Sequence, residues 1–227
     1  MEEEIRNLLR STNRPGIENL INFLQKNAFF VAPASINHHL NYTGGLAEHS
    51  LNVYKQFKRL RNEYKLDIPE ENMIISGILH DVCKIDDYTK EVTNKPTEKQ
   101  VSFLNNLVDQ NNKVLKNNID DLGKSQVSEL ISWLVDNPSE DEPVFEDYWD
   151  YNNEKEYPFE HGEKSVFMIS QFINLKKREM LAIRYHMGAW EKNLNYKNHN
   201  RAKEMFPDIK LIAIADEIST FKEDWDI

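Results

Sequence analysis

Apolar residues recur along this 227-residue chain at the three- and four-residue spacing of an α-helix, and no segment of strand length alternates apolar with polar side chains. In the segment 16–26, for example, Ile17, Leu20, Ile21 and Leu24 fall on one helix face. The same spacing predicts further helices over 46–64, 70–84, 163–175, 177–187 and 203–222. We therefore expect an all-α fold.

The middle of the chain has a different composition. It is polar and rich in Asn and Lys, and its stretch 139–156 carries eight acidic residues against one lysine. Amphipathic patches around 101–115 and 127–135 predict two helices there. We expect one domain over 1–227, with a helical core at about 16–87 and 157–224 and a polar, acidic insertion at about 88–156.

Composition narrows the setting in which the chain works. Its net charge of −10 argues against affinity for long nucleic acids, because neutralising phosphates requires a surface rich in Lys and Arg. The apolar run 73–79 is far too short to span a bilayer, and the acidic N-terminus does not resemble a signal peptide. A single cysteine, Cys83, excludes an internal disulfide and fits a reducing compartment. We expect a cytoplasmic protein with no membrane partner.

Imidazole and carboxylate side chains interrupt the apolar helical segments at or near their ends. Any one of them alone could be an ordinary core or surface residue, but the joint pattern indicates a metal site. This donor set suits a first-row metal such as Fe, Mn or Zn. Six ligands are about what two metals need when a carboxylate bridges them. The six residues are His49, His80, Asp81, His161, His186 and Asp216.

The order H…HD…H…H…D resembles that of the HD-domain metal-dependent phosphohydrolase superfamily. The likeness is carried by the words FFVAPAS…HHLNYTGGLAEHSLNVY, GILHDVCK, HGEKSV, AIRYHMGAW and IAIADEIS. These words are similar to the small stand-alone HD hydrolases of bacteria and phages, and to the HD module of certain 3′–5′ exoribonucleases. The resemblance covers about 29–87 and 157–222, and it implies a helical bundle around a central metal site.

Carried over by position, the resemblance implies that His49, His80, Asp81 and Asp216 are the core ligands, with Asp81 as the bridging carboxylate. Two more histidines match those of the two-metal members of the superfamily. The resemblance therefore implies two divalent metals, with Fe or Mn preferred and Zn, Ni, Co or Mg as alternatives. The two additional ligands are His161 and His186.

Lys84 matches the lysine that follows the HD pair in several branches of the superfamily, where it faces the phosphate or the metal-bound water. On a continuous helix Lys84 would lie four residues after His80 and on the same face. The resemblance thus implies that Asp81 and Lys84 are the catalytic residues. The alternative for Lys84 is a solvated surface lysine.

Four further side chains are candidates for binding a substrate phosphate. Lys164 lies in the HGEKS segment, and Arg184 precedes His186 by two residues. His38 and His39 could meet the phosphate at the mouth of the site. Arg184 and His186 do not share a helix face, so Arg184 could equally pair with an acid elsewhere, and the two adjacent histidines could equally be a surface pair.

Other side chains near these motifs are given structural roles. Cys83 is interpreted as a small core residue rather than a ligand, because six ligands are available without it. Tyr148, Trp149 and Tyr151 in the insertion could stack a nucleobase, but a hydrophobic plug beneath the insertion is the favoured interpretation.

The resemblance implies a phosphohydrolase in which metal-activated hydroxide attacks the phosphorus of a nucleotide or a small nucleotide-like phosphate ester. The acidic composition favours such a small substrate over a long polymer. The alternatives are a 3′–5′ exonuclease acting on short oligonucleotides and a non-catalytic module that binds metal and nucleotide to regulate a partner. The intact set of six ligands argues against the second alternative.

Overall fold

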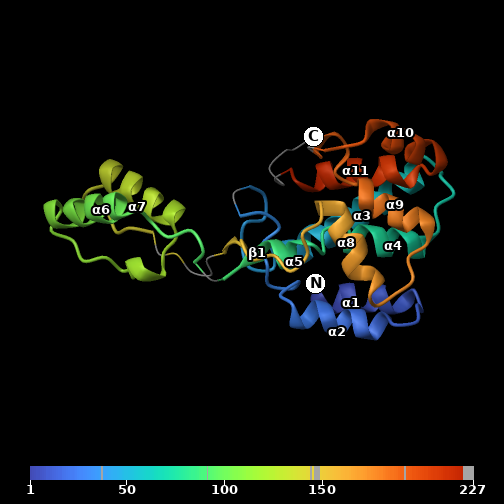
Figure 1. The fold of residues 1–227 in the computed structure, drawn as a ribbon, viewed down its shortest axis with the longest axis horizontal. Helices are drawn as coiled ribbons and strands as arrows, with labels where there is room; N and C mark the ends of the chain where they lie inside the picture. The colour runs from blue at the N-terminus through green and yellow to red at the C-terminus, as the bar shows by residue number, and fades with distance from the viewer. Residues whose placement is uncertain (37, 91, 144, 146–148, 192, 222–227) are drawn as a thin grey trace. The chain divides into compact units, whose positions relative to one another are not determined.

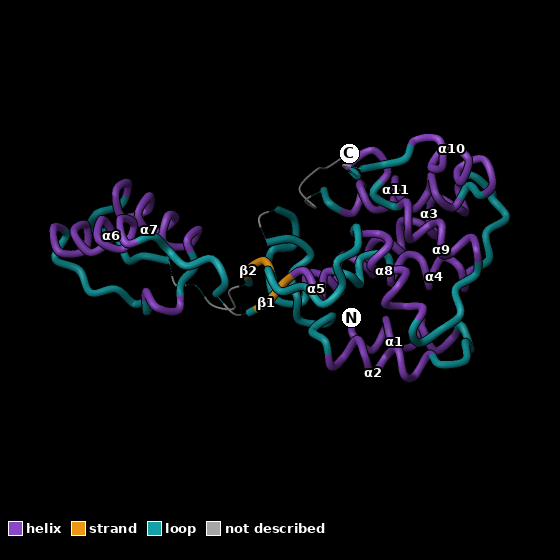
Figure 2. The backbone as a smooth tube through the Cα atoms, in the orientation of Figure 1, coloured by secondary structure: helices purple, strands orange, loops and turns teal. Residues whose placement is uncertain are grey.

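The computed structural model describes residues 1–221 except 37, 91, 144, 146–148 and 192 (Figure 1). The chain divides into two compact units, which are treated separately below. The core unit comprises Met1–Asp86 and Lys155–Ile227, and the middle unit comprises Asp87–Glu154. Helices dominate, and the described residues form one sheet of two short strands (Figure 2). The prediction of an all-α fold is therefore confirmed.

Helices α3, α4, α9 and α11 make the centre of the core unit. Helix α3 packs against α4 and α11, and α9 packs against α4, α8 and α11. Helix α1 packs against α2 and also contacts α3 and α4. The helices are α1 Glu2–Ser11, α2 Ile17–Lys26, α3 Gly45–Glu63, α4 Glu70–Leu79, α5 Lys84–Asp87, α8 His161–Ser170, α9 Lys177–Tyr185, α10 Tyr196–Met205 and α11 Asp208–Ser219.

Helix α3 shows why the apolar spacing predicted these elements well. Its residues Leu46, Val53, Phe57 and Leu60 are all buried, as the three- and four-residue spacing requires of one face. The opposite face carries exposed basic residues such as Lys55. This amphipathic helix thus lies with one face in the core and the other in water.

Helix α4 approaches α3 closely because Gly77 stands at their contact. A Cβ atom on Gly77 would lie 2.8 Å from the Cα atom of Tyr54, so a larger residue would push the two helices apart. The spacing predicted that this helix continues to residue 84, but α4 ends at Leu79. Beyond it the backbone makes i to i+3 hydrogen bonds, from Lys84 to Asp81 for example, which tighten the chain into successive turns.

The segment 203–222, predicted as one helix, contains a break instead. Pro207 disfavours the helical conformation in the residue before it, and Phe206 is extended with φ −141° and ψ 124°. Helix α10 therefore ends at Met205 and α11 begins at Asp208. Residue 222, where the predicted helix ends, lies outside the described residues.

The middle unit contains a helical hairpin and the small sheet. Its elements are β1 Tyr88–Thr89, α6 Glu98–Gln110, the 3₁₀ turn Ile119–Asp121, α7 Lys124–Asp136 and β2 Asp150–Tyr151. The strands are antiparallel, with Tyr88 opposite Tyr151. Helices α6 and α7 pack on each other around a separate apolar cluster of Leu104, Leu122, Val127, Leu130 and Leu134.

The aromatic residues singled out in this unit differ in environment. Trp149 is buried, whereas about half of Tyr151 is exposed and Tyr148 lies outside the described residues. Across the described part of the chain, no helix combines the length and the apolar composition needed to span a membrane.

Candidate metal centre

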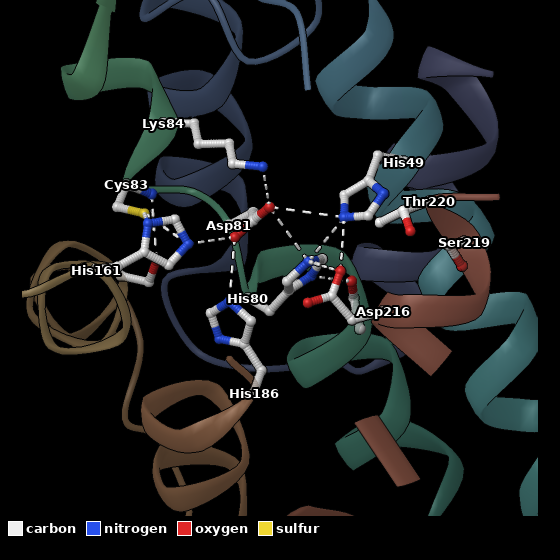
Figure 3. Close-up of polar contacts among 12 residues, drawn as sticks. His49, His80, Asp81, Cys83, Lys84, His161, His186, Asp216, Ser219 and Thr220 are labelled. Atoms are coloured by element: carbon white, nitrogen blue, oxygen red, sulfur yellow. Dashed lines mark hydrogen bonds and ion pairs between the residues drawn. The ribbon is translucent and has the colours of Figure 1, made fainter. Parts of the chain in front are cut away.

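The six side chains of the H…HD…H…H…D pattern meet in the core unit, drawn in Figure 3. His49 lies near the start of α3, and Asp216 lies in α11, which packs against α3. His80 and Asp81 follow the last residue of α4 directly. The remaining two are His161, the first residue of α8, and His186, the residue after α9.

One oxygen of the Asp81 carboxylate faces His49, His80 and Lys84. Its Oδ2 atom lies 3.6 Å from His49 Nε2, 3.4 Å from His80 Nε2 and 2.6 Å from Lys84 Nζ. Asp216 closes this side, because its Oδ1 atom lies 3.0 Å from His49 Nε2 and 3.7 Å from His80 Nε2. Two imidazole nitrogens and two carboxylate oxygens therefore converge at one position.

The other oxygen of the same carboxylate faces the remaining two histidines. Asp81 Oδ1 lies 2.6 Å from His161 Nε2 and 3.2 Å from His186 Nε2. The rings of these two histidines lie with their centroids 5.2 Å apart. Each oxygen of Asp81 thus faces two imidazoles, and the His186 ring also lies beside His80, with ring centroids 4.8 Å apart.

Backbone carbonyls orient two of the rings. His80 Nδ1 lies 2.9 Å from the carbonyl oxygen of Gly77, and His186 Nδ1 lies 2.6 Å from that of Ile183. A carbonyl oxygen can only accept, so each Nδ1 carries the proton and each Nε2 is left with its lone pair toward the cluster. Metal-binding histidines usually donate their other ring N–H to a backbone carbonyl or a carboxylate in this way.

The donor atoms fit a metal ion. Among the described residues His186 Nε2 is buried without a hydrogen-bond partner, which is costly unless another species occupies its lone pair. The potential ligand atoms form three groups, and within each group they lie within 4.8 Å of one another. The groups are His49 with His80 and Asp81, His80 with His186 and Asp216, and Asp81 with Cys83 and His161.

Both carboxylates are held in their ionised form. Burial alone would raise the pKa of Asp81, but Lys84 and the nearby imidazoles outweigh burial and hold that pKa well below its usual range. Burial also opposes ionisation of Asp216, and the hydrogen bond with His49 nevertheless lowers the pKa of its carboxyl group. The cluster therefore offers two negative charges to a cation.

Lys84 reaches the site by a different route from the one predicted. Because α4 ends at Leu79, Lys84 does not share a continuous helix face with His80. In the turns that follow α4, the side chain of Lys84 instead reaches back to Asp81, three residues earlier, and its Nζ atom contacts the Asp81 carboxylate. The expectation of a shared helix face was wrong, although the side chain does lie at the cluster.

Two residues expected to bind phosphate have other partners. Lys164 is 1 % exposed, and its Nζ atom lies 3.0 Å from Oδ2 of Asp86. Arg184 lies with Nε 2.9 Å from Glu163 and Nη1 2.7 Å from Glu191. Arg184 therefore pairs with acidic residues, which is the alternative that the sequence left open for it.

The adjacent histidines before α3 lie in unlike environments. His39 is partly buried, with its ring centroid 5.0 Å from that of His49. Burial lowers the pKa of His39 to about 4, so this ring is neutral at physiological pH. His38 is exposed, and its backbone N–H donates to Ser35 Oγ. Only His39 lies beside the cluster.

Cys83, interpreted from the sequence as a core residue, is buried and touches the cluster as well. Its Sγ atom lies 3.2 Å from His161 Nδ1. Burial would lower the pKa of His161, but Cys83 and Asp81 together raise it to about 10. The position of Cys83, two residues after Asp81 in a segment that turns back on itself, is the signal that could have placed it here.

Comparisons with known proteins agree with this arrangement. A model of the HD domain family matches residues 46–144, which include His49, His80 and Asp81. The chain is similar to the dihydroneopterin 2′,3′-cyclic phosphate phosphodiesterase of Methanocaldococcus jannaschii, with 36% identity over 64 residues.

That match covers 26% of this chain and 26% of the relative, so the chain spans about a quarter of the length of the curated relative it matches. No solved structure matches the chain. The family match over residues 46–144 and the meeting of all six motif residues among packed helices both support the HD-domain superfamily.

Proposed function

We propose that this protein is a metal-dependent phosphohydrolase with a centre for two divalent cations. The observation that carries the proposal is the division of the Asp81 carboxylate, whose Oδ2 faces His49 and His80 and whose Oδ1 faces His161 and His186. Cations placed on the two sides of a shared carboxylate suit the hydrolysis of a phosphate ester.

Four of the ligands would hold the first cation, namely His49, His80, Asp81 and Asp216. The second would be held by Asp81, His161 and His186. When bound, the metals supply Lewis acidity, which lowers the pKa of water and offsets negative charge on a phosphoryl group. The resemblance to the HD-domain superfamily favours Fe or Mn as the ions of this centre.

Lys84 is the residue of the chain best placed to contact the phosphoryl group. Its ammonium lies 2.6 Å from Asp81 Oδ2, the carboxylate oxygen that faces His49 and His80. A positive charge fixed there favours the negative charge that grows on the non-bridging phosphoryl oxygens during attack. Asp81 in turn holds the ammonium in place.

We propose a nucleotide or a small nucleotide-like phosphate ester as the substrate. The net charge of −10 disfavours long nucleic acids, whose phosphates require a basic surface. The similar protein from Methanocaldococcus jannaschii is named for a 2′,3′-cyclic phosphate, which is a small phosphodiester. Cyclic phosphodiesters therefore belong at the head of a substrate panel.

The test combines metal analysis with that panel. Protein purified without chelators is expected to carry about two metal equivalents per chain. It is expected to hydrolyse at least one of 2′,3′-cyclic nucleotides, nucleoside triphosphates and short oligonucleotides. Asp81→Asn should abolish hydrolysis and remove metal, whereas Asp67→Asn, which changes an exposed aspartate outside the cluster, should leave both unchanged.

The panel separates the alternatives. Stepwise shortening of oligonucleotides, with mononucleotide esters left intact, would favour the exonuclease. A nucleotide that raises the melting temperature but is recovered intact would favour the non-catalytic module. Hydrolysis that survives Asp81→Asn with metal still bound would overturn the assignment of the site.

A further inference from the structure

The four candidate histidine ligands differ in what their outer ring nitrogen, Nδ1, contacts. In His80 and His186 it contacts a backbone carbonyl oxygen, and in His161 it lies 3.2 Å from Cys83 Sγ. In His49 it is buried and has no hydrogen-bond partner among the described residues. The dashed lines that reach His49 in Figure 3 all meet its other nitrogen, Nε2. One ligand of the first cation position thus lacks the outer contact that the other three histidines have.

A metal ion would make this missing contact matter. An imidazole that gives Nε2 to a metal carries its proton on Nδ1, and metal-binding histidines almost always donate that N–H to an acceptor. The acceptor fixes the orientation of the ring and makes the ring a better ligand. A buried N–H group without an acceptor is costly. His49 therefore needs an acceptor on the outer side of its ring.

His39 carries an atom of the required kind beside that ring. Its Nε2 atom is also buried without a partner among the described residues. The ring centroids of His39 and His49 lie 5.0 Å apart, with 49° between the ring planes. At this separation a ring rotation or one bridging water can join a nitrogen of one ring to a nitrogen of the other. A neutral imidazole offers one acceptor nitrogen, so the two unsatisfied atoms are complementary.

The backbone next to His39 is fixed against the start of α3. Gly45 lies one helical turn before His49, and a Cβ atom on this glycine would overlap the carbonyl oxygen of Leu40. The same carbonyl accepts a hydrogen bond of 3.1 Å from the backbone N–H of Ala34. Leu40 has φ 47°, in the left-handed region that bulky residues rarely adopt. The fold itself therefore holds the ring of His39 beside that of His49.

We propose that His39 is a positioning residue for His49, whose Nδ1–H it accepts at Nε2 either directly or through one water. The contact holds the His49 ring with its own Nε2 toward the first cation. This inference rests on the two-cation centre proposed above and deepens it by giving one ligand its outer partner. In this role His39 touches neither the cation nor the substrate.

Two substitutions of His39 test the proposal through metal affinity. His39→Phe keeps a flat ring against His49 but removes the acceptor nitrogen. It is expected to weaken the binding of one of the two Zn²⁺ equivalents by about 10- to 100-fold and to leave the other unchanged. His39→Gln keeps an acceptor oxygen and should recover most of that affinity. Competition of the full-length chain with a chromophoric chelator measures both equivalents.

The neighbouring histidine provides the matched control. His38 is exposed, so His38→Ala should leave the affinity for both Zn²⁺ equivalents unchanged. Urea denaturation of the metal-free variants separates positioning from packing. The proposed hydrogen bond matters most once a metal has placed the proton on Nδ1 of His49, so His39→Phe and His39→Gln should have similar free energies of unfolding without metal.

The outcomes distinguish this inference from the proposed function. Two Zn²⁺ ions bound as tightly by His39→Phe as by the wild-type chain would overturn the role of His39 and leave the two-cation centre standing. A raised KM in that variant with unchanged metal affinity would make His39 a substrate contact and would also overturn the proposal. Equal losses of affinity in His39→Phe and His39→Gln would contradict it as well. A folded wild-type chain that binds no zinc, manganese or iron would overturn both the inference and the two-cation centre.

Discussion

Lys84 and Lys164 are both close to carboxylates, but their surroundings give them different roles. Lys84 contacts Asp81 at the edge of the metal centre. Lys164 is fully enclosed and contacts Asp86, whose two carboxylate oxygens also accept from the backbone N–H groups of Glu156 and Tyr157. The first lysine lies at the cluster, and the second ties the start of α8 to the chain around it.

Replacing Lys84 tests its contact with substrate. Lys84→Met is expected to lower kcat by about 100-fold, because a cation that offsets transition-state charge is lost. Steady-state kinetics on the best substrate of the panel measures kcat, and elemental analysis of the same samples measures their metal content. Lys177→Met, at an exposed position, is the control. A loss of activity that follows a loss of metal would instead show that Lys84 positions Asp81.

Replacing Lys164 tests a structural role. Lys164→Met leaves the Asp86 carboxylate without its buried cation, which is expected to lower the free energy of unfolding by roughly 3 kcal/mol. Urea denaturation measures the change. Activity per folded molecule should stay near that of the wild type, and a raised KM with unaltered stability would return Lys164 to the substrate contacts.

At the scale of elements, the metal centre depends on how closely α3 and α4 pack. Gly77 lets the backbones approach, and His80 follows it by three residues, directly after the end of α4. Glu70, the first residue of α4, accepts a hydrogen bond from Tyr54 and ion pairs with Lys58 and Arg61 of α3. The helix is thus attached to α3 near both of its ends.

Gly77→Ala is expected to lower the free energy of unfolding by about 1–3 kcal/mol, because a Cβ atom 2.8 Å from Tyr54 Cα forces the helices apart. The same displacement moves His80 away from His49 and should weaken binding of the first cation. Urea denaturation and metal titration measure the two effects. Unchanged metal affinity in a destabilised variant would show that the ends of α4 adjust independently.

The ion pairs of Glu70 predict a pH dependence of stability. Burial opposes its ionisation, but Lys58 and the Tyr54 hydroxyl outweigh burial and lower the pKa of Glu70. A carboxyl whose folded-state pKa is lowered stabilises the fold above its unfolded pKa of about 4.3, and that contribution is lost as the pH falls. Glu70→Gln should therefore destabilise by about 1 kcal/mol at pH 7 and by much less near pH 3, measured by urea denaturation.

Sequence periodicity predicted the buried helix faces but not where helices end. The spacing of Val53, Phe57 and Leu60 is a local pattern, so α3 could be read directly. Pro207 would have allowed the break at Phe206 to be predicted. The end of α4 at Leu79 is followed by no proline or glycine that would predict it. The pairing of Tyr88 with Tyr151 joins distant segments and leaves no local signal.

At the scale of the whole molecule, the candidate site draws on both segments of the core unit. His49, His80 and Asp81 precede the middle unit, and His161, His186 and Asp216 follow it. The motif order was readable from the sequence, and so was each donor type. The partners of Arg184 and Lys164 were not, because Glu191, Glu163 and Asp86 meet them only once the helices have packed.

The extent of the apolar core predicts what metal removal does. Buried residues come from α1, α2, α3, α4 and α11, so the fold does not depend on the cluster alone. Chelation is expected to leave the helical circular dichroism intact. It should lower the melting temperature by roughly 5–10 °C, the effect of losing a ligand present at about 100 times its Kd. Unfolding on chelation would show instead that the metal is structural.

The order of the ligands along the chain has a consequence for biosynthesis. His49, His80 and Asp81 are synthesised early and Asp216 only near the end of translation. At typical translation rates the time between Asp81 and Asp216 is on the order of ten seconds. Throughout that interval the nascent chain holds an incomplete set of donors. Tight metal binding is therefore expected only after translation has passed α11, so a prematurely terminated chain should be released without a complete set of candidate ligands.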